Sequence, residues 1–280
     1  MPTLRIVPEL PEVETVRRAI APVLEGASIK HAEIFDARLV RPFDPSIVAA
    51  ALVGERVAEV GRRGKYVIVG FDSGRSLLIH LRMTGSVRYA QRGMLADDPH
   101  RRAVLRLDNG SDVAYRDVRR FGTWELFEPG DLDDYLDARL GPEPLGAFSA
   151  SHLHRRLEGK RAPLKSALLD QRTIAGLGNI YVDEALWHSE LHPLRPAGEL
   201  DQPEVVRLHR AIRKVLRTGI ARQGSTLRDY TQPDGSYGSM QDEFRAYGRG
   251  GEPCYRCGVP LTRIVVGGRT TTFCPDCQSP

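Results

Sequence analysis

The sequence predicts an α+β protein of two domains: an antiparallel β-sandwich with an N-terminal helix, followed by a helical domain that ends in a zinc-binding hairpin. Three observations predict this class. Short apolar or alternating runs separated by turn residues occupy residues 28–128. Helical periodicity dominates residues 151–222. Two Cys-x-x-Cys pairs close the chain.

The N-terminal helix is predicted from about Pro11 to Pro22. Val13, Val16 and Ile20 recur at helical spacing and would form its buried face. Proline suits the first helical position, and the carboxylates beside it suit the positive end of the helix dipole.

The sandwich is expected to contain strands that are short and separated by turns such as Asp72-Ser73-Gly74 and Asp108-Asn109-Gly110. Pro45–Leu52 is expected to form a short helix between strands. The spacing favours an antiparallel sandwich. The expected strands are Ser28–Phe35, Arg56–Val60, Tyr66–Phe71, Ser76–Leu81, Ala103–Leu107, Val113–Tyr115 and Thr123–Phe127.

The composition changes at Gly130–Phe148, where glycine and proline favour a linker. Gly224–Gly251 has no periodicity and is long for an idle connection, so we expect it to be functional. Helices are expected at Ser151–Glu158, Pro163–Asp170, Asn179–Ser189 and Glu204–Arg222. The predicted boundaries are 8–135 for the sandwich, 136–150 for the linker, 151–245 for the helical domain and 246–280 for the zinc module.

The bulk composition limits the class of protein. The 280 residues are 41% hydrophobic, which is ample for a packed core. No apolar run is long enough for a membrane helix, and residues 1–7 are too short for a signal peptide. We therefore expect a soluble, cytoplasmic protein that does not contact a membrane. The net charge of +4 fits a polyanionic partner without requiring one.

The four cysteines form the pattern of a structural zinc site. Two thiolate pairs supply four soft tetrahedral ligands and leave no position open for water, so the metal would be structural rather than catalytic. Disulfides or unrelated thiols are the weaker alternative. The residues are Cys254, Cys257, Cys274 and Cys277. Between the pairs, Arg269 follows two glycines, which suits either a phosphate contact or a solvated turn.

Several motifs together resemble one family, formamidopyrimidine-DNA glycosylase, from about Val7 to Gln278. Within the family, residues 224–230 and 233–235 resemble the branch that acts on oxidised purines. The related endonuclease VIII branch usually has Gly in place of Leu10, and that Gly is absent here. The motifs are Pro8-Glu9-Leu10-Pro11-Glu12-Val13-Glu14, Gly64-Lys65-Tyr66, His80-Leu81-Arg82-Met83-Thr84-Gly85, Arg119-Arg120-Phe121-Gly122, Gly176-Leu177-Gly178-Asn179-Ile180-Tyr181 and the cysteine cluster.

The resemblance implies a bifunctional DNA glycosylase and abasic-site lyase that removes oxidised purines from damaged double-stranded DNA. It implies a helix-two-turn-helix domain, one structural zinc ion and a monomer. A free Pro8 amine would attack the sugar C1′ and form an iminium, and Glu9 would shuttle protons at the sugar. Glu12 either supports substrate positioning or is simply a helix-terminus carboxylate.

The resemblance also implies the DNA-contacting residues. Lys65 and Arg269 complete the catalytic set by holding phosphates near the lesion. Met83, Arg119 and Phe121 would fill the gap left by the flipped base. The remaining predicted DNA contacts are His100, Arg119, Arg120, Asn179 and Lys165, and the predicted lesion loop contains Arg228, Asp229 and Tyr230, which we expect to be disordered without DNA.

The chain as written conflicts with this chemistry, because the Pro8 nitrogen is a tertiary amide with no nucleophilic lone pair. Val7 stands where the family has its initiator methionine, and GUG encodes valine but also starts translation in bacteria. We expect Met1–Ile6 to be an artefact of the assigned start, with translation beginning at codon 7. In a structure of the chain as written, we expect residues 1–7 to lack a packed place of their own and to crowd the DNA-facing pocket. Two alternatives remain: an endonuclease VIII-like glycosylase for oxidised pyrimidines, and a non-catalytic DNA-binding zinc protein if residues 1–7 persist.

Overall fold

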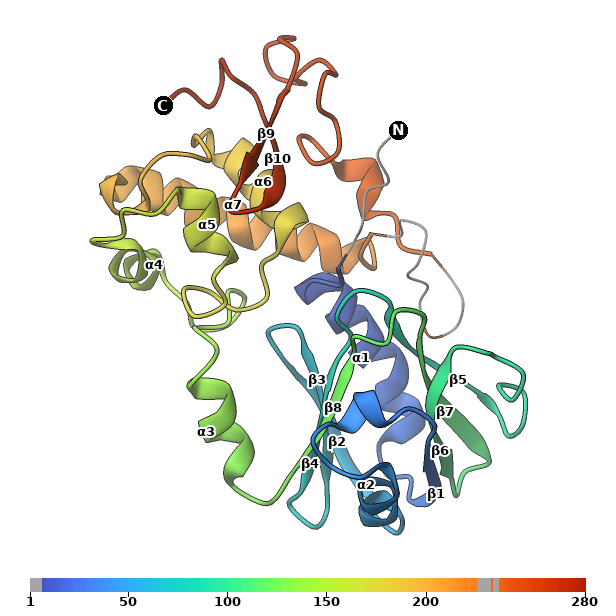
Figure 1. Ribbon diagram of the computed structural model, residues 1–280. Helices are drawn as coiled ribbons and strands as arrows, with labels where there is room; N and C mark the ends of the chain where they lie inside the picture. The colour runs from blue at the N-terminus through green and yellow to red at the C-terminus, as the bar shows by residue number, and fades with distance from the viewer. Residues whose placement is uncertain (1–6, 226–232, 234–236) are drawn as a thin grey trace. The chain divides into compact units, whose positions relative to one another are not determined.

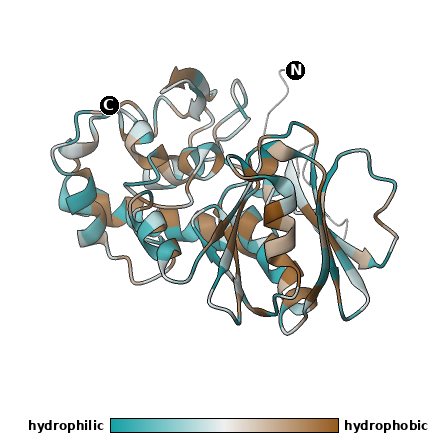
Figure 2. Cartoon of the chain, turned by 60° about the horizontal axis from the view of Figure 1, so that its bottom comes forward, coloured by the Kyte–Doolittle hydropathy of each residue, from teal (hydrophilic) through white to brown (hydrophobic). Residues whose placement is uncertain are grey.

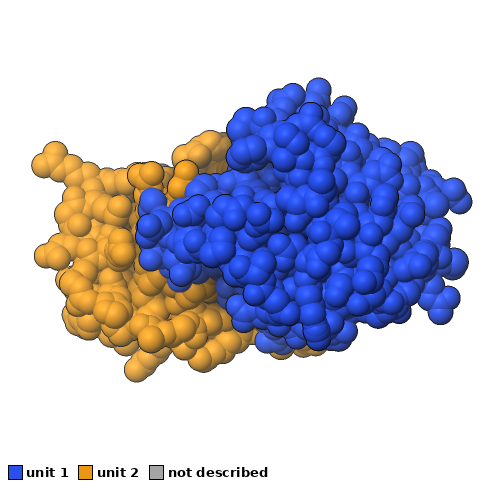
Figure 3. All heavy atoms as spheres, turned by 90° about the horizontal axis from the view of Figure 1, so that it is seen from below, with its two compact units in different colours: residues 1–138, 223–238 blue, residues 139–222, 239–280 orange. Residues whose placement is uncertain are grey.

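The computed structural model describes residues 7–225, 233 and 237–280. The chain divides into two compact units (Figure 3). The first comprises Met1–Ala138 and Gln223–Gly238, and the second Arg139–Arg222 and Ser239–Pro280. Among the described residues, no helix combines the length and the apolar character needed to cross a membrane.

The first unit is built around helix α1, Leu10–Leu24, which confirms the predicted N-terminal helix and extends it by a few residues. Its predicted apolar face, Val13, Val16 and Ile20, is completely buried. The helix packs against strands of both sheets, and its side chains join theirs in one core (Figure 1). Burial of this face therefore fixes the position of the helix start.

Two four-stranded antiparallel sheets form the predicted sandwich, with strand orders β1-β6-β7-β5 and β2-β3-β4-β8. Apolar residues gather on the surfaces where helix and strands face each other (Figure 2). The strands are β1 Ile29–Ile34, β2 Val57–Arg63, β3 Tyr66–Phe71, β4 Ser76–His80, β5 Gly85–Gln91, β6 Arg101–Leu107, β7 Ser111–Asp117 and β8 Thr123–Phe127. A short η1 turn, Ala37–Val40, and helix α2, Pro45–Leu52, follow β1.

Within the described residues, one strand and one α-helix escape the sequence prediction, as do the three short η helices. β5 begins with glycine and serine and has weak alternation, and it is a strand because its backbone pairs with β7 along its whole length. Helix α3, Asp131–Asp137, lies inside the segment expected to be a linker. Three aspartates in its first turn suit the positive end of the helix dipole.

The second unit contains the predicted helices and the hairpin. Helix α7 starts at a capping box in which Asp201 and Glu204 satisfy each other's backbone N–H groups. The elements are α4 Ala150–Leu157, α5 Leu164–Leu169, α6 Asn179–Ser189, η2 Ala197–Glu199, α7 Gln202–Ala221, η3 Met240–Glu243, β9 Thr262–Val266 and β10 Arg269–Phe273. Each predicted helix is present within two residues of its expected ends.

Helices α6 and α7 approach closely at a glycine in the interior of α7. A Cβ at Gly219 would lie 2.6 Å from the ring of Tyr181 on α6, well inside contact distance. Tyr181 is fully buried and has no room to retreat. Glycine is costly inside a helix, so its presence here reflects this contact.

Gly219→Ala is expected to destabilise the protein by about 1–3 kcal/mol, because overpacking outweighs the helix-propensity gain of about 0.5–1 kcal/mol. Urea unfolding followed by circular dichroism would measure it. The control is Arg217→Ala, an exposed change on the same helix, which should leave the midpoint nearly unchanged. A neutral or stabilising Gly219→Ala would show that the space beside Tyr181 does not require glycine at this position.

Candidate functional site

Pro8 and Glu9 lie immediately before α1, and both are buried. The Glu9 N–H donates to the Glu12 carboxylate at 3.0 Å. Glu12 is completely buried and also accepts the N–H and hydroxyl of Ser225, at 2.8 and 3.1 Å. It therefore joins the helix start to the segment that precedes the predicted lesion loop, which goes beyond capping its own helix.

Gly224 makes this junction possible. Its φ of +78° is in the left-handed region, and a Cβ there would lie 2.9 Å from Glu12 Cγ. Any side chain would therefore displace the carboxylate that binds Ser225. Arg228, Asp229 and Tyr230, predicted for the lesion loop, lie outside the described residues.

Lys65 occupies the two-residue turn between β2 and β3, after Gly64 with φ of 56°. Arg62 holds this turn, donating from Nη1 to the Gly64 carbonyl at 3.0 Å. Its Nε binds Glu14 of α1 at 3.1 Å. Burial favours the neutral form of Glu14, but hydrogen bonds from Arg17 and its neighbours lower the pKa of this carboxyl overall. A charged Glu14 thus links the first turns of α1 to the Lys65 turn.

Met83, Arg119 and Phe121 come together, as predicted for the wedge. Arg119 Nη1 donates to Met83 Sδ at 3.2 Å, and its guanidinium lies 4.8 Å from the Phe121 ring centroid. Phe121 is 50% exposed, so it is not a core residue. The three side chains form one cluster on two neighbouring loops, in which Phe121 is exposed and Met83 and Arg119 are half-buried.

Arg120 points away from this cluster and binds Asp36, so its predicted DNA contact stays a prediction. Its φ of 61° is left-handed, and its Nη2 donates to Asp36 Oδ1 at 2.8 Å. The hydrogen bond from Arg120 lowers the pKa of Asp36. Arg120 therefore anchors its loop to the N-cap residue of η1.

His80 supports the turn that leads to Met83. Its Nδ1 accepts the Arg82 N–H at 2.9 Å, which holds Arg82 at a φ of 54°. Burial, with the nearby charges of Arg82 and Lys65, lowers the pKa of His80 to about 3. The ring is therefore neutral, and this nitrogen stays available as an acceptor.

His100 is half-buried beside the same loops. Its N–H donates to Asp98 at 2.8 Å, and its carbonyl accepts the Asp117 N–H at 3.0 Å. The backbone of His100 thus supports the end of β7, and its predicted DNA contact stays a prediction.

In the second unit, Asn179 and Arg269 lie close together. Asn179 is the first residue of α6, after Gly178, and its Nδ2 donates to the Thr270 carbonyl at 2.9 Å. Arg269, next to Thr270, is exposed after a turn whose glycines both have positive φ. The hairpin therefore presents its arginine beside the N-terminus of a helix, where backbone N–H groups favour an anion.

Lys165 does not lie where a DNA contact requires it, and this prediction is corrected. Its side chain is completely buried, and its ammonium donates to Asp183 at 2.6 Å and to the Thr270 carbonyl at 2.9 Å. Asp183 also accepts the Thr272 N–H at 3.0 Å. Lys165 therefore fastens the hairpin to α5 and α6, since a buried ammonium paired in this way cannot reach a phosphate.

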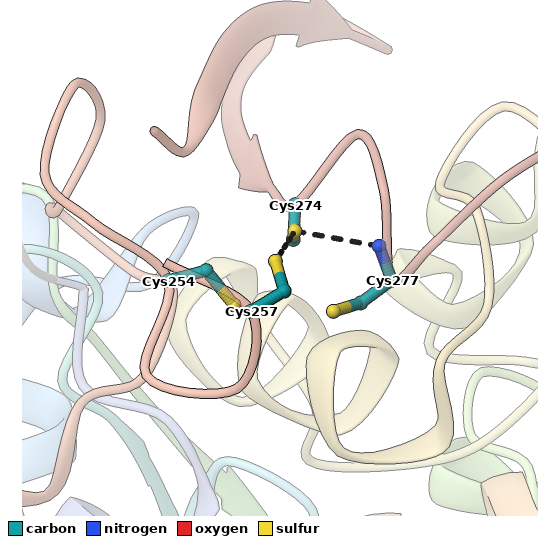
Figure 4. Close-up of side chains that lie close together, drawn as sticks. All are labelled: Cys254, Cys257, Cys274 and Cys277. Atoms are coloured by element: carbon teal, nitrogen blue, oxygen red, sulfur yellow. Dashed lines mark hydrogen bonds between the residues drawn. The ribbon is translucent and has the colours of Figure 1, made fainter. Parts of the chain in front are cut away.

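The four cysteines converge from the two ends of the hairpin, as Figure 4 shows. Their sulfur atoms lie within 4.8 Å of one another, and Cys257 and Cys274 are 3.4 Å apart. That separation is too long for a disulfide and matches ligands about 2.3 Å from a shared zinc ion. Trp187 Nε1 and the Arg256 N–H donate to Cys254 Sγ, each at 3.4 Å, which favours the thiolate. The donor set fits one structural zinc.

Three carboxylates that organise these features are absent from the site residues predicted from the sequence. Glu14 and Asp117 bind the loops of the first unit. Glu184 of α6 accepts three successive N–H groups, Arg245 to Tyr247, at the start of the zinc module. Burial raises the pKa of Glu184 to about 7. Each also binds a group that is more than 30 residues away in the sequence, and local spacing does not identify such contacts: Arg62 for Glu14, Thr84 for Asp117 and Arg245 for Glu184.

Zinc should be present at one ion per chain and should be lost from Cys257→Ser under dialysis that leaves the unaltered protein loaded, because one of four ligands is missing. Atomic emission would measure zinc, and a chromogenic chelator its rate of release. Ser279→Ala, beside the cluster, is the control and should stay loaded. Full retention of zinc by Cys257→Ser would contradict the four-thiolate site.

Three family models match the chain. The formamidopyrimidine-DNA glycosylase N-terminal domain matches residues 7–124, and the corresponding H2TH domain matches residues 140–231. The zinc finger found in FPG and IleRS matches residues 251–280. The Lys165 hairpin contacts and the cysteine cluster lie within the last two of these matches.

Curated relatives and solved structures match over nearly the whole chain. A formamidopyrimidine-DNA glycosylase from Chloroflexus aggregans is 46% identical, covering 97% of this chain and 98% of its own. A MutM structure in complex with DNA containing carbocyclic 8-oxo-G has a TM-score of 0.89 at 38% identity, covering 98% and 100%. Lactococcus lactis FPG with DNA containing an oxidized pyrimidine has a TM-score of 0.89 at 37% identity, with the same coverage. This chain belongs to the formamidopyrimidine-DNA glycosylase family.

Proposed function

We propose that this protein is a DNA repair glycosylase that excises oxidised purines, including 8-oxoguanine and formamidopyrimidines, and cleaves the strand at the resulting abasic site. The observation that carries the proposal is the buried Pro8–Glu9 pair, held at the start of α1 by Glu12. A potential amine nucleophile thus lies next to a carboxyl group on a rigid element. The Chloroflexus aggregans relative, a formamidopyrimidine-DNA glycosylase by name, supports the same activity.

The reaction would begin when a free Pro8 amine attacks C1′ of the damaged nucleoside. The bond from C1′ to the base breaks, and the base leaves with a proton. Glu9 donates a proton to the sugar ring oxygen, so the ring opens and the C1′–N bond becomes an iminium. The iminium acidifies the C2′ proton, and successive eliminations release the 3′ and 5′ phosphates. Water then hydrolyses the iminium and frees Pro8.

This chemistry requires Pro8 at the N-terminus. With Val7 attached, the nitrogen is part of a planar amide whose lone pair is delocalised. A free N-terminal amine instead has a reference pKa of about 7.7–8.0 and is partly unprotonated near neutral pH. We propose that the active form begins at Pro8, through translation from codon 7 and removal of the initiator methionine.

The enzyme would act as a monomer on damaged duplex DNA in the bacterial cytoplasm. Lys65 in the first unit, and Asn179 with Arg269 in the second, would hold phosphates around the lesion. The gap left by the extruded base would be filled by Met83, Arg119 and Phe121. Arg119 would also form a hydrogen bond with the base on the opposite strand that has lost its pairing partner. The cysteine cluster would contribute by fixing the hairpin that carries Arg269.

An oxidised pyrimidine is the second candidate substrate. The Lactococcus lactis relative has been solved with DNA that contains such a base. Parallel assays on 8-oxoguanine opposite C and on thymine glycol would separate the two. Faster excision of 8-oxoguanine is expected, and a clear preference for thymine glycol would reassign the substrate.

Borohydride should trap a covalent adduct between 8-oxoguanine duplex and protein that begins at Pro8, and none with protein that retains residues 1–7. The reason is that only a free amine forms a reducible iminium. Gel shift and intact mass would measure the adduct and the N-terminus. Glu9→Gln in the Pro8 form is the control: it should still trap a preformed abasic site while losing base excision. Equal trapping by the longer form, with its terminus verified, would assign the nucleophile elsewhere.

Lys65→Ala and Arg269→Ala should each weaken binding to all duplex sequences and reduce the slope of log K against log salt by about 0.9, the value of one lost phosphate contact. Fluorescence anisotropy at several salt concentrations would measure both. Lys30→Ala and Arg217→Ala remove exposed charges from the same two units and serve as matched controls. An unchanged slope would remove the tested residue from the phosphate contacts.

A further inference from the structure

Asp117 is a buried carboxylate at the end of β7, between the two loops that carry the wedge residues. Its side chain is 1% exposed. One loop is the turn before β5, which contains Met83 and Thr84. The other, between β7 and β8, contains Arg119 and Phe121. Asp117 is therefore the residue from which both loops can be held.

The contacts of Asp117 reach both loops. The Thr84 hydroxyl donates to Asp117 Oδ1, and the Arg119 N–H donates to the same oxygen at 3.2 Å. Asp117 Oδ2 accepts the Gly122 N–H at 2.7 Å. One carboxylate thus fixes the backbone on both sides of Phe121 as well as the side chain next to Met83.

Thr84 completes the connection. Its hydroxyl donates its proton to Asp117 and also accepts the Arg119 N–H at 3.0 Å. Thr84 is 5% exposed, so water does not replace these bonds in the folded protein. A hydroxyl with this double role couples the turn at Met83 directly to the loop at Arg119.

The backbone of Asp117 is itself fixed from the other side. Its N–H donates to the His100 carbonyl at 3.0 Å, and its carbonyl accepts Arg102 Nε at 2.9 Å. Its position is therefore set by the sheet, while its carboxylate sets the loops. This matters because Phe121 is half exposed and lacks core packing to define its direction.

We propose that Asp117, acting through Thr84, is a positioning residue that presets Met83, Arg119 and Phe121 for insertion into damaged duplex DNA. This inference rests on the proposed function. It assigns Asp117 to the duplex-opening step and gives it no part in the chemistry at Pro8. The distinction is testable, because single-stranded abasic DNA has no opposite base and leaves no gap for the wedge to fill.

The decisive variants are Thr84→Val and Thr84→Ser. Valine has nearly the shape of threonine but loses the hydroxyl, whereas serine keeps it. In protein that begins at Pro8, Thr84→Val should lower kcat/KM on an 8-oxoguanine duplex by about tenfold or more, the effect of losing a hydrogen bond to a charged acceptor. Cleavage of a single-stranded abasic oligonucleotide should change by less than about twofold on the same scale. Thr84→Ser keeps the hydroxyl and should therefore keep the duplex activity of the unaltered protein.

A spectroscopic readout isolates the wedge. A duplex with a tetrahydrofuran abasic analogue opposite 2-aminopurine reports insertion as a fluorescence change on binding. Thr84→Val and Asp117→Asn should both reduce the amplitude at saturating protein, and Thr84→Ser should not. Thr173→Val is the matched control, since that buried hydroxyl donates to Asp170 in the second unit, and it should leave the amplitude unchanged.

The outcomes separate the two levels of the proposal. If the unaltered Pro8 form neither excises 8-oxoguanine nor forms an adduct, the proposed function fails. If it does both, and Thr84→Val matches Thr84→Ser in duplex activity and fluorescence amplitude, the positioning role of Asp117 is overturned. A parallel loss of duplex and single-strand cleavage by Thr84→Val would also overturn it, since that pattern marks general damage to the fold.

Discussion

The first unit depends on the hydrogen bonds that the buried Glu12 carboxylate accepts at the start of α1. Glu12 has no access to solvent, yet it accepts the N–H of Glu9 and two hydrogen bonds from Ser225. A buried carboxylate without such partners would be costly. The same contacts hold Glu9, next to the buried Pro8, and tie the segment after α7 to the helix start. Glu14, two residues further along α1, binds Arg62, and Arg62 in turn binds the Gly64 carbonyl in the turn that carries Lys65.

The second unit solves a different problem, which is to hold a small hairpin that has little core of its own. Zinc joins its two ends through the cysteines. The tip is held separately, by the buried pair of Lys165 and Asp183 and by the amide of Asn179. Breaking a buried ion pair of this kind leaves an uncompensated charge, so the pair specifies one position for the hairpin. Arg269 is exposed on a rigid support as a result.

Most elements were predictable because their signals are local. The apolar face of α1, the alternation in β3 and β8 and the capping box of α7 can each be identified within a few residues. β5 could not be predicted in this way, because its sequence pattern is weak and its strand conformation depends on pairing with β7. The prediction that Lys165 contacts DNA is wrong for a related reason. A lysine is normally exposed, and the partner that buries this one, Asp183, comes from a different helix.

The sequence by itself determined the family, the zinc ligands and the conflict at Pro8, because these depend on residue identity, short spacing and covalent structure. Only the tertiary structure decided how the motifs are held: Asp117 between the wedge loops, Glu12 beneath Ser225, and Lys165 inside the second unit. These roles depend on which distant groups meet in a buried environment. Hydrogen bonds and burial create that environment together, and no local pattern encodes it.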